Sequence, residues 1–361
     1  MNQEPIRVCH PVALDDHPYI SQLRDALNEY NVRLEDTRRQ GAIFLSMLAG
    51  RLPRVVHFHW MHSFFLPEIP FGGAVWPNLR SRGFVATLDA LKRSGRKIVW
   101  TAHNLVNHER KAMAADRRCH KAIASRADGV IAHSASAADR LQETFGIDDA
   151  RLHVIPHGHF IDWYPSFQSD AQARSALNIA DEKFVFGFFG NIRRYKQVPH
   201  LIRTYLDHIQ EAYTHLLIAG NPRTDALERE IREAADHADD VDLHLSFVPE
   251  DRVQTYIKAS DVMVFPYDSI LTSGSAILAM SMSRPVLGPR LGSLQDIVGP
   301  EEGFLYDPES EGLVEAMRTA IEKDARLERM GKAAFERAQT WGWNKIGRKT
   351  RSLYDDLLDS D

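Results

Sequence analysis

The feature that most constrains the fold of this 361-residue chain is a repeated alternation between short apolar runs and amphipathic segments. Runs such as residues 97–101, 184–189 and 303–306 have the β-branched and aromatic content of buried strands. Between the runs, segments such as 18–30 and 198–208 carry apolar residues at helical spacing. Strands that alternate with helices throughout both halves predict an α/β chain with two doubly wound parallel sheets. In open sheets of this kind, ligands bind at the carboxyl ends of the strands.

The two halves are separated by a connection rich in Pro and Gly at residues 156–165, which has no helical period. A chain of this length usually forms two domains. We therefore expect one domain over residues 1–160, a second domain over residues 161–340 and a C-terminal amphipathic helix within residues 341–361. A ligand cleft between the two domains follows from this arrangement.

Composition excludes several classes of protein. With 44% hydrophobic and 26% charged residues and a net charge of −5, the chain is typical of a soluble globular protein, and nothing in it calls for a nucleic-acid partner. No apolar stretch reaches the length of a membrane span, and the N-terminus lacks the apolar region of a signal peptide. Cys9 and Cys119 offer no disulfide framework, which favours a reducing compartment. We expect a cytoplasmic protein, or one attached to a membrane only at its surface.

Three loops of the second half follow predicted strands, at residues 190–196, 220–222 and 267–275. The first loop supplies Arg193 and Lys196. The third is a Thr-Ser-Gly turn that opens into a helix, and such a helix start attracts a phosphate through its unpaired N–H groups. Many α/β proteins cap helices in this way without a ligand, but the combination with two cations predicts a diphosphate site that needs no metal. Neither a nicotinamide fingerprint nor a P-loop motif is present.

Histidines dominate the corresponding loops of the first half. The close spacing of His57, His59 and His62 suggests zinc, but no cysteine or acidic pair nearby completes a site, so we predict no metal. Histidines that hydrogen-bond hydroxyl groups in the core or cleft fit better, with His103 facing the cleft. Glu109 is a candidate general base if burial raises its pKa, and the alternative is an ordinary acid in the first turn of a helix.

Residues 63–82 interrupt the alternation with a stretch rich in Phe, Pro and Gly. One interpretation is a loop packed on its own domain. The other is a flap that faces the acceptor or a membrane, with Phe64, Phe65, Phe71 and Trp76 as interfacial anchors. If the acceptor is lipid-linked, four arginines near this stretch are placed to meet anionic headgroups: Arg51, Arg54, Arg80 and Arg82.

These features together resemble a known family. Two Rossmann-like halves, with a basic loop after the first strand of the second half and a helix start before Pro285, resemble the GT-B nucleotide-sugar glycosyltransferases. More closely, seven segments in the same order are similar to the bacterial xanthan-type β-mannosyltransferases, with a more distant likeness to glycosyltransferase family 4. The segments are residues 17–23, 57–60, 103–109, 157–163, 192–196, 219–222 and 273–287.

The resemblance implies an inverting transfer of mannose from GDP-mannose to a lipid-linked oligosaccharide, with no metal and no other cofactor. The resemblance also implies a role in exopolysaccharide biosynthesis and a peripheral contact with the membrane. The donor site it implies comprises Gly190, Arg193, Lys196, Asn104, Asn221, Tyr267, Ser273, Gly274 and Ser275. The catalytic candidates are Glu109 and His103, and the acceptor side of the cleft comprises Asp16, His59, Trp60 and His159.

Two glutamates eight residues apart mark the large retaining family-4 relatives, and this chain has Ile270 and Leu278 at those positions. Their absence removes the usual hydroxyl ligands and argues against retaining chemistry. Three alternatives stay open at this point: a UDP-sugar such as glucose or glucuronic acid as the donor, a non-catalytic partner subunit of the same fold, and a sugar-phosphate epimerase.

Overall fold

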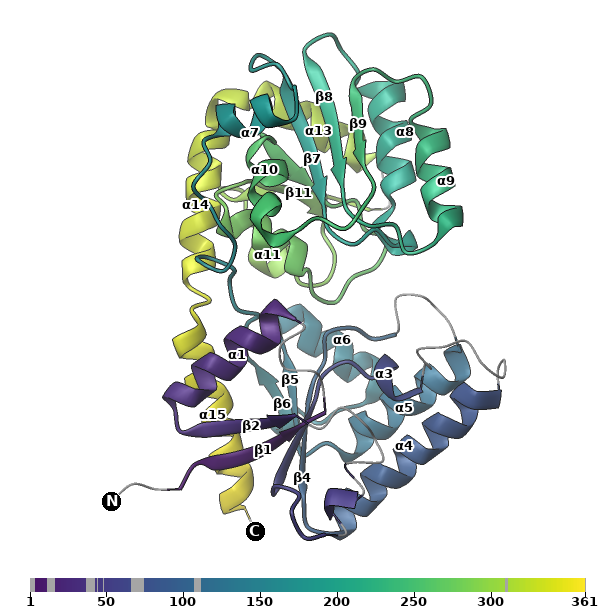
Figure 1. The fold of residues 1–361 in the computed structure, drawn as a ribbon, viewed down its shortest axis with the longest axis vertical. Helices are drawn as coiled ribbons and strands as arrows, with labels where there is room; N and C mark the ends of the chain where they lie inside the picture. The colour runs from purple at the N-terminus through teal and green to yellow at the C-terminus, as the bar shows by residue number, and fades with distance from the viewer. Residues whose placement is uncertain are drawn as a thin grey trace. The chain divides into compact units, whose positions relative to one another are not determined.

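The computed structural model describes residues 4–11, 17–36, 43, 45–47, 49–65, 75–106, 112–308 and 311–360. The chain divides into two compact units, each built on a six-stranded parallel sheet (Figure 1). The first unit extends to Gly158 and takes in the chain from Trp341 onward, and the second spans His159–Thr340. The predicted fold class, two doubly wound parallel sheets, is confirmed.

The first sheet has the strand order β2-β1-β3-β4-β5-β6. Every neighbouring pair is parallel, so the carboxyl ends of all six strands lie at one edge. The apolar central strands are buried because helices cover the sheet. The strands are β1 (Ile6–His10), β2 (Val32–Asp36), β3 (Val55–Phe58), β4 (Lys97–Thr101), β5 (Gly129–Ala132) and β6 (Leu152–Val154).

Helices from both ends of the chain pack on this sheet. The C-terminal helix α15 lies along α1, and its Ile346, Leu353 and Tyr354 belong to the same buried cluster as Val8 of β1. The sequence pattern placed this C-terminal segment in neither domain. The helices of the first unit are α1 (Pro18–Glu29), α3 (His62–Phe65), α4 (Val75–Arg93), α5 (Met113–Arg126), α6 (Ala135–Phe145) and α15 (Trp343–Asp359).

The interpretation of residues 63–82 as a flap with membrane anchors is wrong for Phe64 and Phe65. Phe64 and Phe65 are buried in α3, where Phe64 packs on Phe84 with ring centroids 4.9 Å apart, so neither can anchor in a membrane. From Val75 onward the stretch forms the first turns of α4. Pro77 is tolerated there because it lies in the first turn, where its missing N–H breaks no hydrogen bond. Phe71 lies outside the described residues.

The second sheet has the order β12-β11-β10-β7-β8-β9, also with parallel neighbours throughout. The three loops singled out in the sequence therefore emerge at one edge of this sheet, after β7, β8 and β10. The strands are β7 (Phe184–Phe189), β8 (Thr214–Ala219), β9 (Val241–His244), β10 (Val262–Val264), β11 (Val286–Pro289) and β12 (Gly303–Tyr306).

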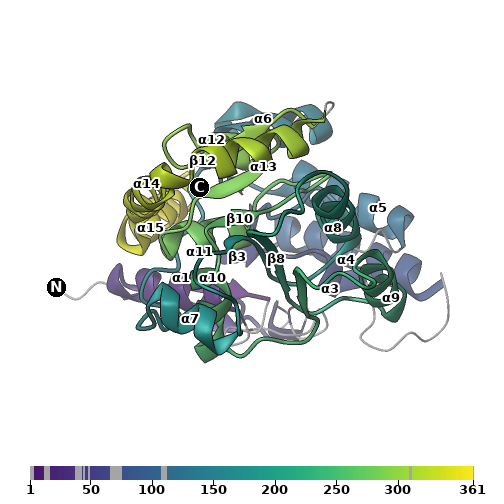
Figure 2. The same ribbon diagram turned by 90° about the horizontal axis from the view of Figure 1, so that it is seen from above.

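Eight α-helices accompany this sheet in the part of the chain that the structure describes. Figures 1 and 2 show α8 and α9 side by side, and α11 packs against α14. The helices are α7 (Asp170–Ala176), α8 (Val198–His208), α9 (Asp225–Ala234), α10 (Val253–Lys258), α11 (Gly274–Ser281), α12 (Leu294–Ile297), α13 (Gly312–Glu322) and α14 (Leu327–Gln339).

Both cysteines are buried and free, Cys9 in β1 and Cys119 in α5, as the sequence predicted. No helix within the described ranges combines the length and the apolar character that crossing a membrane requires.

Candidate functional site

In the second unit, two glycines let the ends of β7 and β8 approach each other closely. Gly190 and Gly220 have φ values of +127° and +150°, which residues with a side chain rarely adopt. A Cβ atom on Gly220 would lie 1.9 Å from the carbonyl oxygen of Gly190. A Cβ atom on Gly190 would lie 2.6 Å from Ser275 Oγ and 3.4 Å from Lys196 Nζ. Gly190 thus leaves space at the point where the β7 loop, Lys196 and the start of α11 meet.

Lys196 is a buried cation at this point. It ends the short 3₁₀ turn η2 (Arg194–Lys196) and is only 7% exposed. Its Nζ lies 5.8 Å from the Phe188 ring centroid and 5.6 Å from that of Tyr267. Burial, with a smaller contribution from the charge of Arg193, lowers the pKa of Lys196 to about 7. No carboxylate in the described ranges pairs with Lys196, so an anionic ligand would supply the missing counter-charge.

The N-terminus of α11 faces the same space. Ser273 caps the helix by accepting a hydrogen bond from the Ala276 N–H at 3.1 Å, and its hydroxyl lies 3.4 Å from the hydroxyl of Tyr267. The N–H groups of Gly274 and Ser275 have no partner within the helix. The Thr272 hydroxyl is buried and has no hydrogen-bond partner among the described residues. A helix N-terminus with these groups can hold an anion.

A main-chain contact fixes the two loops relative to each other. The Asp268 N–H donates to the carbonyl of Tyr195 at 2.9 Å, and the Gln197 amide donates to the Asp268 carboxylate at 2.8 Å. The structure thus brings together most of the predicted donor residues of this unit: Gly190, Lys196, Tyr267, Ser273, Gly274 and Ser275. Arg193 is half-buried next to this group. Asn221 is exposed, and its carbonyl accepts from the Ile192 N–H at 2.9 Å.

In the first unit, histidines gather at the carboxyl edge of the sheet. Five neighbouring strands, β1, β3, β4, β5 and β6, each end in or are soon followed by a histidine. Tyr19 of α1 packs among them, with ring centroids between 4.7 and 5.8 Å from those of four histidines: His59, His103, His133 and His157. His10, His17, His133 and Tyr19 were missed as site residues, although histidines at or soon after the ends of these five strands were visible in the sequence.

His103, one of the predicted catalytic residues, lies inside this cluster. Its Nε2 is 3.0 Å from Nδ1 of His59, and its ring stacks on Trp60 with centroids 4.4 Å apart. The structure therefore brings together three predicted residues from the loops after β3 and β4: His59, Trp60 and His103. The buried Asn104 side chain donates to the carbonyl of Val106 at 2.9 Å, which stabilises the turn that follows His103.

His57 connects this edge to the C-terminal helix. Its Nδ1 is 2.7 Å from the hydroxyl of Tyr354 in α15, and its Nε2 is 2.8 Å from Thr101 Oγ1 at the end of β4. All three side chains are buried. Because a neutral imidazole needs one donor and one acceptor partner, these two hydroxyl groups satisfy it completely. The sequence predicted histidines that bond hydroxyl groups but gave no signal for Tyr354, which is 297 residues away.

Burial keeps these histidines neutral. Desolvation is the largest cause that lowers the pKa of His57, His59 and His103 well below the ordinary value, and neighbouring histidines lower it further. The Nδ1–H of His133 donates to the Ile155 carbonyl, 3.0 Å away, and burial lowers the pKa of His133 to about 4. The neutral imidazole of His103 has one nitrogen that can accept a hydrogen bond, but its lowered pKa makes it a weak base near neutral pH.

The remaining predicted residues stand apart from these groups. His159 is half-buried and belongs to the second unit. Asp16 and Glu109 lie outside the described residues. Among the side chains that the structure describes, no group of three or more His, Cys, Asp or Glu residues is arranged to hold a metal ion.

Two family models match the chain. The model described as glycosyl transferases group 1 matches residues 183–323, and the one described as glycosyltransferase family 4 matches residues 78–162. A GDP-mannose:glycolipid 4-beta-D-mannosyltransferase of Xanthomonas campestris is 27% identical over 84% of this chain and 81% of its own length. A D-inositol 3-phosphate glycosyltransferase of Gordonia bronchialis is 26% identical over 75% of this chain and 63% of its own length.

Solved structures share the fold. Sucrose-phosphate synthase from Thermosynechococcus elongatus has a TM-score of 0.75 at 19% identity, covering 99% of this chain and 100% of that one. Anabaena HepE, solved in complex with UDP and glucose, has a TM-score of 0.72 at 15% identity, covering 97% of this chain and 99% of that one. These likenesses confirm the predicted GT-B fold.

The buried histidines predict that acid destabilises the first unit. The pKa of His133 is about 4 in the folded chain, whereas an unfolded histidine titrates near 6.5. The unfolded state therefore binds the extra proton, so this stabilisation is complete above pH ~6.5 and is lost as the pH falls toward 4. At about pH 5, we expect His133 alone to lower the free energy of unfolding by about 2 kcal/mol, measured by urea denaturation.

Two variants test the cause. His133→Gln removes the titrating ring and should weaken the pH dependence by that amount. His237→Gln, at a side chain that is 93% exposed, should leave the pH dependence unchanged. If His133→Gln loses as much stability on acidification as the wild type does, burial of His133 is not the cause.

Proposed function

We propose that the chain is a glycosyltransferase of the GT-B fold that transfers mannose from GDP-mannose, with inversion, to a lipid-linked or oligosaccharide acceptor in bacterial polysaccharide biosynthesis. The observation that carries this proposal is the site of the second unit, where a buried lysine without a carboxylate partner in the described chain faces a helix N-terminus. The name of the Xanthomonas relative supports the choice of mannose and of a glycolipid acceptor.

The second unit offers what a departing diphosphate requires. The ammonium of Lys196, the guanidinium of Arg193, and the N–H groups of Gly274 and Ser275 would share the charge that develops on the leaving oxygen. The buried hydroxyl of Thr272 adds a donor. These groups supply positive charge from the chain itself, which is why we propose a metal-independent, cofactor-free transfer.

The first unit would supply the acceptor side and the general base. Glu109 is the first candidate for the base, and His103, which is neutral and positioned by His59 and Trp60, is the second. Ile270 and Leu278, in place of two glutamates, support inversion, because apolar side chains offer the sugar hydroxyls no hydrogen bond. We also propose that the enzyme works in the cytoplasm, in peripheral contact with the inner face of the cell membrane.

A UDP-sugar is the second candidate donor, because the similar structure of HepE was solved with UDP and glucose. A thermal-shift panel of GDP, UDP, dTDP, ADP and CMP at equal concentration separates the two, since a ligand that binds only the folded state raises Tm with its affinity. We expect the largest shift with GDP, unchanged by EDTA. The largest shift with UDP would replace mannose by glucose or glucuronic acid, and no shift with any nucleotide would favour a non-catalytic partner subunit.

Lys196 predicts a pH-dependent donor affinity. Its pKa of about 7 in the free protein should rise when a diphosphate supplies the counter-charge, so binding above pH 7 takes up a proton. The Kd of GDP should therefore increase about tenfold per pH unit above pH ~7, measured by calorimetry in buffers of different ionisation enthalpy. Lys196→Met should abolish this dependence.

The same substitution tests catalysis. Lys196→Met and Arg193→Ala should each lower kcat/KM by about 10²-fold or more with Tm of the free protein preserved, because each removes a cation from the leaving diphosphate. Lys332→Met is the matched control, because that side chain is 77% exposed on α14. Wild-type turnover in both site variants would overturn the diphosphate assignment.

The base is tested separately. Glu109→Gln should lower kcat by about 10²- to 10⁴-fold while leaving the nucleotide-induced thermal shift intact, because only proton transfer is removed. If Glu109→Gln stays active, Glu109 is excluded as the base. His103→Asn should then lose both kcat and the acidic limb of the pH–rate profile.

A further inference from the structure

The paired helices α4 and α5 of the first unit carry an excess of positive charge on a chain whose net charge is −5. Together they contain eight Lys or Arg residues and two Asp residues. Asp116 is fully buried, and Asp89 forms an ion pair with Arg126. The surface that these two helices expose is therefore strongly cationic. The rest of the chain has a net charge that is more negative than −5.

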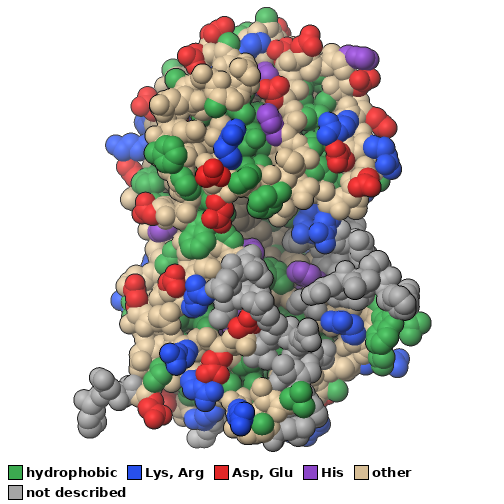
Figure 3. All heavy atoms as spheres, in the orientation of Figure 1, with side chains coloured by type: hydrophobic (Ala, Val, Ile, Leu, Met, Phe, Trp, Pro, Cys, Tyr) green, Lys and Arg blue, Asp and Glu red, His purple; other side chains and the backbone are tan. Residues whose placement is uncertain are grey.

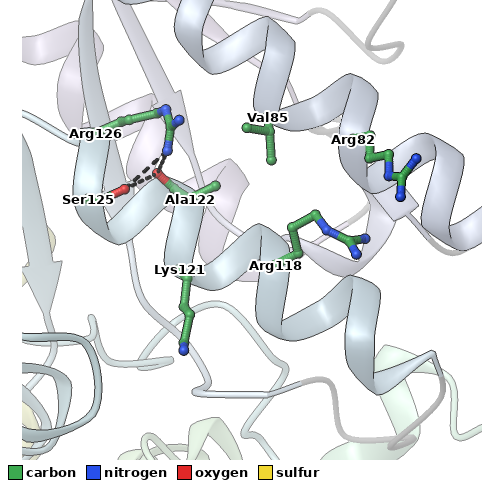
Figure 4. Close-up of a pocket in the computed structure, with 7 residues that line it drawn as sticks. All are labelled: Arg82, Val85, Arg118, Lys121, Ala122, Ser125 and Arg126. Atoms are coloured by element: carbon green, nitrogen blue, oxygen red, sulfur yellow. Dashed lines mark hydrogen bonds between the residues drawn. The ribbon is translucent and has the colours of Figure 1, made fainter.

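A surface pocket of about 440 Å³ lies between the two helices (Figure 4). Arg118 donates to Asn78 Oδ1 at 3.2 Å and to Ser81 Oγ at 2.6 Å, and both of these acceptors are neutral. Figure 4 shows Arg126 turned back onto its own helix, whereas Lys121 extends away from it. The pocket is lined by Arg82, Val85, Arg118, Lys121, Ala122, Ser125 and Arg126.

Three cations of this pocket have no ion-pair partner in the described part of the chain: Arg82, Arg118 and Lys121. Arg82 and Lys121 are exposed, and Arg118 is held in place by its two neutral acceptors. The guanidinium group of Arg118 is therefore pre-oriented without being neutralised. A cluster of this kind suits phosphate oxygens supplied from outside the molecule.

Apolar side chains project from the same helix. At the start of α4, Val75 is 74% exposed, Trp76 47% and Leu79 58%. Val75, Leu79 and Arg82 follow one another at helical spacing, so the apolar end and the cationic pocket share one face of the helix. Figure 3 shows hydrophobic side chains gathered beside basic ones on this unit. An exposed Trp next to Arg and Lys is typical of segments that lie in the interface of a bilayer.

We propose that this α4–α5 surface docks the first unit onto an anionic lipid bilayer. Trp76 and Leu79 would lie at the level of the headgroups, and Arg82, Arg118 and Lys121 would contact lipid phosphates. Charge complementarity favours this occupant, because these two helices carry a net positive charge whereas the remainder of the chain is net acidic. The inference rests on the proposed function in one respect, that a lipid-linked acceptor lies in that membrane.

Sedimentation with lipid vesicles tests the surface. The full chain should bind vesicles made of equal parts phosphatidylcholine and phosphatidylglycerol, bind phosphatidylcholine vesicles much less, and dissociate as salt rises. The double variant Arg82→Gln with Lys121→Gln should bind the anionic vesicles about tenfold or more weakly, since each basic residue contributes about a fivefold factor. Trp76→Ser should also bind more weakly, but with an unchanged salt dependence.

The matched control is Arg229→Gln with Lys345→Gln, which removes the same charge from exposed positions elsewhere on the chain and should bind as the wild type does. Equal vesicle binding by the Arg82/Lys121 variant and this control would overturn the proposal, as would binding that is indifferent to phosphatidylglycerol. The two proposals can fail separately. If the chain binds vesicles through this surface but shows no thermal shift with any nucleotide, the docking surface stands and the donor assignment falls.

Discussion

Parallel pairing of the strands is the constraint on which both candidate sites depend. In each six-stranded sheet all neighbours run in the same direction, so every strand delivers its following loop to one edge. In the second unit this brings Gly190 and Lys196, which follow β7, to the start of α11, which follows β10. In the first unit it brings five histidine-bearing strand ends together. Reversal of one strand in either sheet would move its loop to the opposite edge and dismantle the group.

The two groups of residues differ in charge. In the second unit Lys196 is buried near two aromatic rings without a carboxylate among the described residues, so the site lacks negative charge that an anion can provide. In the first unit the histidines are buried beside one another and stay neutral. Burial disfavours a charged imidazole, and a charge on one histidine would also disfavour a charge on its neighbours. The site around Lys196 therefore favours an anionic ligand, whereas the histidine cluster disfavours a charge on its own side chains.

Much of the fold was predictable because strands of parallel sheets are continuous apolar runs, and β4, β7 and β12 have the bounds that their sequences predicted. Prediction failed where composition is ambiguous: the aromatic stretch before Trp76 suggested a flap, yet Phe64 and Phe65 are core residues and Val75 begins a helix. A pattern reports that a side chain is apolar but not which surface covers it, and only the packing of α3 on α4 settles that.

The sequence by itself determined the two parallel sheets, their alternating helices and the loops that carry Lys196, Ser273 and His103, because periodicity and the rule for strand ends are local. The tertiary structure alone decided what these residues meet. Tyr354 reaches His57 because α15 returns to the first sheet, and Lys196 lies near Ser275 because β10 pairs beside β7. Contacts between segments so far apart in sequence depend on how whole elements pack, and no local pattern of residues encodes that distance.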